Sequence, residues 1–137
     1  MQPAPSGEIA ADLRQRAGRL KNDLARGQAA LRDAYEARGD AIRLLRGRCQ
    51  LVDDILKTLW QESRLPLGLS LVAVGGYGRR ELFPASDVDL LFLLPDNVAQ
   101  ETERQIEELI GLLWDIGLDI GHSVRTIAEC ASESAAD

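Results

Sequence analysis

The chain has 137 residues, of which 45% are hydrophobic and 28% charged, which is ordinary for a soluble globular protein. This length suffices for one domain with a buried core. The formal net charge of −6 argues against a general nucleic-acid binder, which needs a basic surface. No apolar run is long enough to cross a bilayer. From the charge we expect no nucleic acid among the partners, and from the lack of a long apolar run we expect no membrane.

The chain contains two cysteines, Cys49 and Cys130, which lie far apart in the sequence. Their spacing fits neither a disulfide framework nor a metal site. The first residues also lack the apolar stretch of a signal peptide. We therefore expect a reducing compartment, and a cytoplasmic location.

The first half of the chain predicts helices. Residues 1–7 hold two prolines, a serine and a glycine, and are expected to form a disordered lead. Residues 8–65 are rich in Ala, Leu, Arg and Glu, with apolar residues at helical spacing, and predict an N-terminal helical region. Gly27 is expected to interrupt this region, so that a second helix spans residues 29–62. Two further glycines within that helix leave open its division into two.

The second region, residues 66–137, predicts a small sheet flanked by helices. Short apolar runs indicate strands, and a longer amphipathic run between the last two indicates a helix. The expected strands are residues 69–74, 88–94 and 118–125, and the expected helices are residues 77–82, 98–114 and the short tail 126–137. Asp96 or Asn97 is the expected N-cap of the middle helix, and Gly117 its end. The fold class is therefore α+β, with a helical N-terminal region before a small mixed sheet.

A glycine turn and a pair of aspartates carry the chemistry. Gly75 and Gly76 follow the first strand, and glycines there let a phosphate approach the backbone. Asp87 and Asp89 open the second strand, where residues i and i+2 project from the same face. Two carboxylates so close repel each other unless a cation lies between them. The combination points to Mg²⁺ and a nucleoside triphosphate, although each part alone also fits a plain turn or a solvated strand end.

These residues resemble the nucleotidyltransferase superfamily, whose members share DNA polymerase β-like chemistry. The resemblance is closer to the N-terminal part of the bacterial PII uridylyltransferase/uridylyl-removing enzymes. It is dense over residues 71–130, and implies a polymerase β-like core that is incomplete at its C-terminus. It rests on the segments Gly75-Gly76-Tyr77-Gly78-Arg79, Glu81-Leu82, Ser86-Asp87-Val88-Asp89-Leu90-Leu91, Leu113-Trp114-Asp115 and Gly121-His122-Ser123-Val124-Arg125-Thr126.

The resemblance implies that UMP passes from UTP to a tyrosine hydroxyl of the signalling protein PII, with release of pyrophosphate. Asp87 and Asp89 would bind Mg²⁺, and the glycine pair would hold the phosphates. The family's third acid follows on the next strand between apolar residues, and Asp119 fits that setting better than Asp137. UTP, PII and Mg²⁺ are thus the expected partners and cofactor of a multifunctional bacterial enzyme that regulates nitrogen metabolism.

Several polar residues near this motif have open roles. Arg79 is a candidate phosphate ligand, or else forms a surface ion pair with Glu81. Ser86 adjoins the aspartates and is a second candidate for the nucleotide site. For His122 and Arg125, the sequence leaves open whether they contact phosphate or serve the structure.

Two further positions qualify the resemblance. Asp119 also fits a plain turn aspartate after Gly117. Where this chain has Arg80, the family's pattern frequently has glycine.

The sequence leaves three functions open. The first is uridylyl transfer to a protein tyrosine. The second is a non-catalytic nucleotide-binding or regulatory module, and the third is an adenylyltransferase. The resembling enzymes continue for several hundred residues, with a metal-dependent phosphohydrolase domain and sensory domains. We therefore expect this chain to be an N-terminal fragment that lacks the uridylyl-removing activity.

Overall fold

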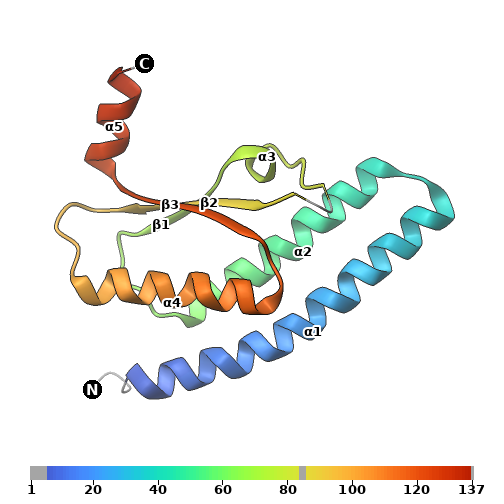
Figure 1. Ribbon diagram of the computed structural model, residues 1–137, viewed down its shortest axis with the longest axis horizontal. Coiled ribbons are helices and arrows are strands. Elements are labelled where there is room, and N and C mark those ends of the chain that lie inside the picture. Colours follow the sequence, from blue (N-terminus) through green and yellow to red (C-terminus); the bar gives the residue numbers. More distant parts are fainter. Residues whose placement is uncertain (1–5, 84–85, 137) are drawn as a thin grey trace.

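The computed structural model describes residues 6–83 and 86–136, so the lead expected at residues 1–7 lies almost wholly outside the described residues. In chain order, the elements are α1 (Ser6–Arg38), α2 (Ala41–Glu62), β1 (Ser70–Ala73), α3 (Gly75–Gly78), β2 (Val88–Leu94), α4 (Gln100–Ile116), β3 (Ile120–Thr126) and α5 (Ile127–Ala136). Helices α1, α2 and α4 lie on one side of the sheet (Figure 1). This arrangement confirms the α+β fold class.

The first two helices form an antiparallel hairpin that turns at Gly39 and Asp40 (Figure 1). Gly39 has a φ of 71°, a left-handed conformation that glycine adopts without a steric penalty. Asp40 is the N-cap of α2, and its carboxylate accepts the amide N–H of Arg43 at 3.1 Å. The second helix therefore begins at Ala41 and not at residue 29, and the break falls at Gly39, one of the two glycines where a division was left open.

Gly27 lies inside α1, so the expected interruption there is wrong. A Cβ at Gly27 would lie 2.8 Å from Leu51 Cδ1 of α2, and the missing side chain lets the two helices approach. Gly47 of α2 faces Leu31 of α1 in the same way. Tertiary packing thus outweighs the low helix propensity of glycine at both positions.

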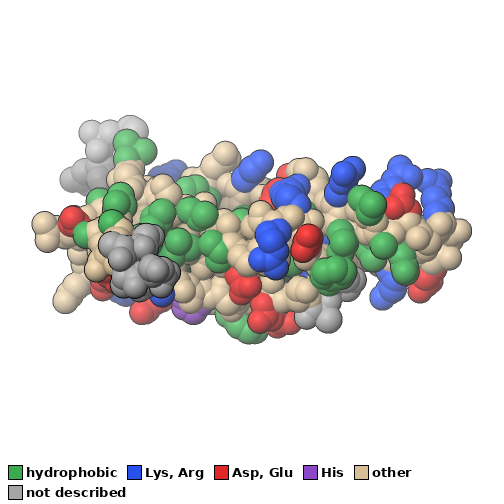
Figure 2. Space-filling view, turned by 90° about the horizontal axis from the view of Figure 1, so that it is seen from above, with side chains coloured by type: hydrophobic (Ala, Val, Ile, Leu, Met, Phe, Trp, Pro, Cys, Tyr) green, Lys and Arg blue, Asp and Glu red, His purple; other side chains and the backbone are tan. Residues whose placement is uncertain are grey.

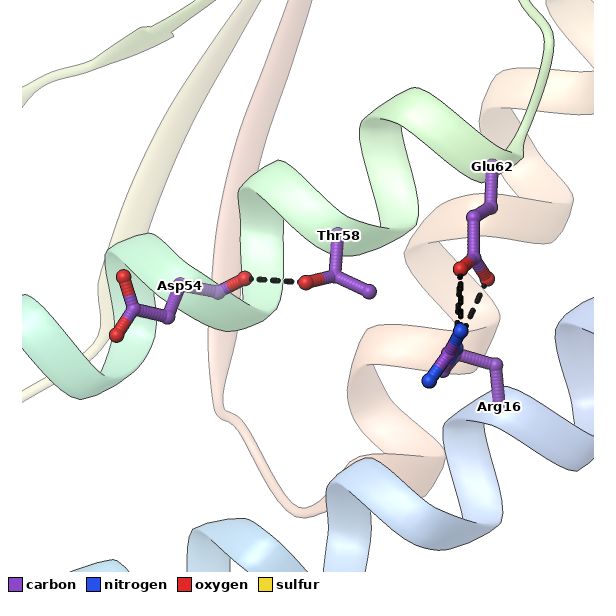
Figure 3. A network of polar contacts seen from close by, with 4 residues as sticks. All are labelled: Arg16, Asp54, Thr58 and Glu62. Atoms are coloured by element: carbon purple, nitrogen blue, oxygen red, sulfur yellow. Dashed lines mark hydrogen bonds and ion pairs between the residues drawn. The ribbon is translucent and has the colours of Figure 1, made fainter.

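An ion pair joins the two helices of the hairpin. Arg16 of α1 points toward Glu62 at the end of α2 (Figure 3), and its Nη2 lies 2.8 Å from the carboxylate. Within α2, the Thr58 hydroxyl donates to the carbonyl oxygen of Asp54 at 2.8 Å. The Arg16 and Glu62 side chains keep 40% and 37% of their surface exposed, so packing contributes more to stability than this pair does.

Strand β2 is the centre of the three-stranded sheet. It pairs antiparallel with β1 and parallel with β3, so the sheet is mixed, as expected. The register places Asp89 of β2 opposite Gly121 of β3, and Ala73 at the end of β1 opposite Leu90. The end of β1 and the starts of β2 and β3 therefore meet at one edge of the sheet.

Helix α4 carries the chain from β2 back to the start of the parallel β3. Its N-cap is Ala99, so the expected N-cap at Asp96 or Asn97 is wrong. Asn97 instead adopts a φ of 65° in the turn that precedes the helix. The expected end at Gly117 is confirmed, because this residue has a φ of 111° in the left-handed C-cap.

The core lies between the sheet and the helices on one side of it. Every second residue of β2, beginning with Val88, is buried, and the residues between them are half-buried. Residues of α2 and α4, such as Leu59 and Leu113, complete the same buried cluster. Asp89 therefore projects from the face of β2 that points away from this core.

The surface charge is uneven. Viewed from the side of α3 and α5, Lys and Arg side chains gather toward the end where α1 meets α2 (Figure 2). Exposed arginines near this hairpin turn include Arg32, Arg38 and Arg43. Among the helices in the described ranges, none has both the length and the apolar character that crossing a membrane requires.

Candidate active site

The glycine turn joins β1 to a single helical turn. Helix α3 begins at Gly75, two residues before the helix expected over residues 77–82, and Gly75 has a φ of 60°. Just before it, the amide N–H of Val74 donates to the carbonyl oxygen of Asp89 at 3.0 Å. This bond ties the turn to β2 and brings Gly75 beside Asp89.

The Asp89 carboxylate lies between two glycines. A Cβ at Gly75 would lie 2.6 Å from Asp89 Oδ2, and a Cβ at Gly121 would lie still closer to Oδ1. No L side chain fits at either position without moving the carboxylate. Glycines from the turn and from β3 therefore create the space that holds this half-buried acid.

Asp87 precedes β2 by one residue and is exposed. The amide N–H of Ser86, directly before Asp87, donates to the carbonyl oxygen of Phe83 at 2.9 Å. In the described part of the chain, no side-chain hydrogen bond or ion pair engages the carboxylate of Asp87 or that of Asp89. Both carboxylates are thus available to a cation. The roles of Asp87, Asp89 and Ser86 stay predictions.

Asp119 lies just before β3 and is exposed. Its carbonyl oxygen accepts the amide N–H of Val88 at 2.7 Å, which places its backbone beside the start of β2. Within residues 6–83 and 86–136, however, no three His, Cys, Asp or Glu side chains form a group that could hold a metal ion. Asp119 as third metal ligand therefore stays a prediction, and Asp137 lies outside the described residues.

A partly buried arginine lies near Asp119. The Nε of Arg48, on α2, is buried and has no hydrogen-bond partner in the described ranges. Burial lowers the pKa of the Arg48 guanidinium, and the charges of Cys49 and Asp119 oppose this effect. The α2 segment around Arg48 thus contributes positive charge near the edge of the sheet where the aspartates lie.

The two arginines after the glycine turn have different partners. The Arg79 Nε lies 3.6 Å from the Glu81 carboxylate, and both side chains are more than half exposed. This loose pair leaves Arg79 able to turn toward a phosphate, which stays a prediction. The Arg80 Nη1 instead lies 2.6 Å from Asp53 Oδ2 of α2. Arg80 also has a φ of 62°, which matches the preference of the family's pattern for glycine there.

His122 and Arg125 lie on opposite faces of β3. His122 pairs in register with Leu90, whose side chain faces the core, so it does not share the face of Asp89. Arg125 pairs with Leu93 and does share that face. Arg125 lies four residues farther along the sheet than Gly121, the partner of Asp89, so the roles of both residues stay open.

Sequence reasoning did not assign three residues that shape this site. Gly121 makes room for Asp89, and Asp53 and Tyr77 connect α2 to the glycine turn. The parallel register of β3 would have revealed Gly121, since it lies directly opposite Asp89. Nothing in the local sequence distinguishes Asp53 from its neighbour Asp54.

Comparisons with known proteins agree with this geometry. A family model described as the nucleotidyltransferase domain matches residues 50–135. The bifunctional uridylyltransferase/uridylyl-removing enzyme of Nitrosospira multiformis is 47% identical over 124 residues, which cover 86% of this chain and 14% of that protein. The protein of the same name from Chromobacterium violaceum is 51% identical over 117 residues, which cover 85% of this chain and 14% of that protein.

The chain thus spans only a small part of the length of these relatives. No solved structure matches it. The matched family region runs from α2 into α5 and contains the whole sheet, the glycine turn and both aspartates. Since this region is more than half of the chain, the chain belongs to the nucleotidyltransferase family.

Proposed function

We propose that this chain is a magnesium-dependent nucleotidyltransferase domain that transfers UMP from UTP to a tyrosine of PII. The observation that carries the proposal is the Asp89 carboxylate between Gly75 and Gly121, with Asp87 two residues before it. The names of the relatives support uridylyl transfer as the reaction. The same proposal makes the protein a cytoplasmic regulator of nitrogen metabolism, with UTP and PII as partners.

The donor set fits Mg²⁺. Asp87 and Asp89 offer carboxylate oxygens, which Mg²⁺ prefers, and neither carboxylate is bound by another residue in the described ranges. These two residues would hold the ion, with Asp119 as the proposed third ligand. When bound, Mg²⁺ would offset the charge of the triphosphate oxygens as the α-phosphorus is attacked.

The residues of the chain would then orient the reactants. The backbone at Gly75 and Gly76 would approach the β- and γ-phosphates, and Arg79 would add positive charge. A tyrosine oxygen of PII forms a bond to the α-phosphorus while the bond to the bridging oxygen breaks and pyrophosphate leaves. The tyrosine proton would pass to a carboxylate, either Asp87 or the third acid.

Nucleotide binding without transfer is the second candidate. It is favoured by one observation: in the described part of the chain, the acids near the glycine turn do not form a three-ligand group. Two carboxylates and a glycine turn suffice to bind a metal–nucleotide complex. An adenylyltransferase would use the same residues, and the choice between bases is decided by experiment.

The test incubates the chain and PII with α-labelled UTP or ATP and Mg²⁺. We expect label on PII from UTP and none from ATP, and loss of labelling when EDTA removes the metal. Replacing both Asp87 and Asp89 by Asn should lower transfer at least about 100-fold, because the ion loses its carboxylate ligands. The control is Asp96→Asn, an exposed acid beyond the far end of β2.

Each outcome separates the candidates. Undiminished transfer after both Asp87 and Asp89 are replaced by Asn would contradict the metal mechanism. Labelling from ATP alone would indicate an adenylyltransferase. Magnesium-dependent UTP binding without labelling of PII would favour the binding module.

A further inference from the structure

Asp53 of α2 binds the glycine turn with both of its carboxylate oxygens. Oδ1 accepts a hydrogen bond from the Tyr77 hydroxyl, and Oδ2 accepts one from Arg80 Nη1 at 2.6 Å. The two donors are 24 and 27 residues away along the chain. Only 19% of the Asp53 side-chain surface is exposed. Helix α2 is therefore bonded to Tyr77 and to Arg80, which are the middle and the end of the segment 75–80 that begins with the glycine pair; this segment is called the turn below.

The turn needs such an attachment because its backbone is unusual at both ends. Gly75 has a φ of 60° and Arg80 a φ of 62°. The left-handed region is unfavourable for Arg80, which carries a Cβ. Between them, short-range bonds close the turn, with the Arg79 N–H donating to the Gly75 carbonyl oxygen at 3.2 Å and the Glu81 N–H to that of Gly76 at 2.8 Å.

The attachment is protected from water on one side. The Tyr77 residue is 2% exposed, and its ring lies among the buried residues of the core. Burial, and after it the hydrogen bond to Asp53, raise the pKa of the Tyr77 hydroxyl, so it remains a proton donor. The same carboxylate raises the pKa of Arg80. Tyr77 and Arg80 thus both remain donors to Asp53 over the neutral pH range.

We propose that Asp53 is a positioning residue that holds the phosphate-binding turn in its nucleotide-binding conformation. The inference rests on the proposed function, and adds a residue that touches neither metal nor nucleotide. Gly75 lies against the Asp89 carboxylate, so a shift of the turn also changes the space around the metal-binding acid. A preformed turn lowers the ordering cost of binding a triphosphate.

The test compares Asp53→Asn with Asp54→Asn. Asp54 is the neighbouring residue on α2, is exposed, and accepts from Gln50 at 2.8 Å without contacting the turn. Both changes remove one negative charge from the same helix. The readouts are amide hydrogen exchange by NMR in the chain alone, and the Kd for UTP with Mg²⁺.

In Asp53→Asn we expect the Arg79 and Glu81 amides to exchange about tenfold faster, and the Kd for UTP to rise about tenfold. Asp54→Asn should change both by less than about twofold. Unchanged exchange at these amides in Asp53→Asn would overturn the inference, and so would an equal change in Asp54→Asn.

A second variant guards against a general loss of folding. Tyr77→Phe keeps the buried ring and removes only the hydroxyl that binds Asp53. We expect the turn amides to exchange about threefold faster, with the β2 amides of Leu90 and Phe92 unchanged. If the β2 amides speed up equally, the contact serves general stability and the inference fails.

Failure of the inference differs from failure of the proposed function. If the unaltered chain does not bind UTP, the proposed function fails and the nucleotide part of the inference falls with it. If the unaltered chain and Asp53→Asn bind UTP equally well, the inference fails and the proposed function stands.

Discussion

Gly75 and Gly121 flank the Asp89 carboxylate, one from the turn after β1 and the other from β3. The position of this carboxylate is set by excluded volume more than by bonds, since none of its described neighbours donates a hydrogen bond to either of its oxygens. A carboxylate held in this way keeps its oxygens available for a cation. The cost is that the two glycine positions tolerate no added methyl group.

Replacing Gly121 by Ala tests this arrangement. The new Cβ would overlap Asp89 Oδ1, so the carboxylate must rotate away. We expect the Kd for UTP with Mg²⁺ to rise about tenfold and the free energy of unfolding to fall by about 1–3 kcal/mol. Calorimetric titration and urea unfolding measure the two effects.

The matched control is Gly111→Ala, because a Cβ at Gly111 of α4 meets no atom within 4 Å. UTP binding by this variant should equal that of the unaltered chain. If Gly121→Ala also binds UTP normally, the space between the glycines does not control the site.

Tyr77 predicts a stability change at alkaline pH. Its folded-state pKa is raised, so the folded chain keeps the proton while the unfolded chain releases it above pH ~10. The stabilisation from this group is therefore complete below pH ~10 and is lost above it, by about 1.4 kcal/mol per pH unit. Urea unfolding between pH 9 and 11 measures the difference between the unaltered chain and Tyr77→Phe. A difference that stays constant over this range would contradict the prediction.

The sequence predicts the site residues unevenly. The i, i+2 spacing of Asp87 and Asp89 is a local pattern, so it can be read without knowing the fold. The role of Gly121 depends on the register between β2 and β3, which no local pattern encodes. Asp53 is harder still, because its partners lie 24 and 27 residues away and its neighbour Asp54 has the same side chain.

At the scale of elements, glycines act in two different ways within the helical hairpin. Gly27 and Gly47 lie where α1 and α2 touch, and each faces a leucine of the other helix. Gly18 also lies in α1, but a Cβ there would meet nothing within 4 Å. From sequence alone the three glycines look alike, because composition does not say which face of a helix meets a neighbour. This is why a break was expected at Gly27, while a division at Gly39 or Gly47 was only left open.

Alanine substitutions should separate these two classes of glycine. Gly18→Ala should raise the free energy of unfolding by about 0.5–1 kcal/mol, since alanine favours the helix and has free space. In Gly47→Ala the new Cβ would overlap Leu31, so we expect a loss of about 1–3 kcal/mol. Urea unfolding measures both values. Equal effects of the two changes would mean that the helices do not pack closely at Gly47.

At the scale of the whole molecule, the helical hairpin and the sheet share one core. Val52 and Leu59 of α2 belong to the same buried cluster as Phe92 of β2 and Leu113 of α4. Asp53 projects from α2 to the glycine turn, so the hairpin also supports the site. The sequence predicts each of the two regions by its own periodicity, but not that α2 lies under the sheet, which depends on contacts between distant residues.

A shared core predicts that the hairpin and the sheet unfold together. Leu59 is fully buried in α2, and Leu59→Ala should lower the free energy of unfolding by about 2–5 kcal/mol. Leu67→Ala is the control, because this leucine is 99% exposed and its loss should cost less than about 0.5 kcal/mol.

Two probes follow the same transition from different parts of the molecule. Far-UV circular dichroism reports the helices, and tryptophan fluorescence includes Trp60, whose ring lies 6.2 Å from that of Phe92 in the sheet. In Leu59→Ala the midpoints of both signals should shift to lower denaturant concentration and the two curves should remain superimposable, because the hairpin and the sheet unfold as one cooperative unit. Separate midpoints, with helical signal persisting after the fluorescence has changed, would mean that the hairpin folds without the sheet. In that case α2 would not be a fixed support for the glycine turn, and substitutions in it would leave UTP binding unchanged.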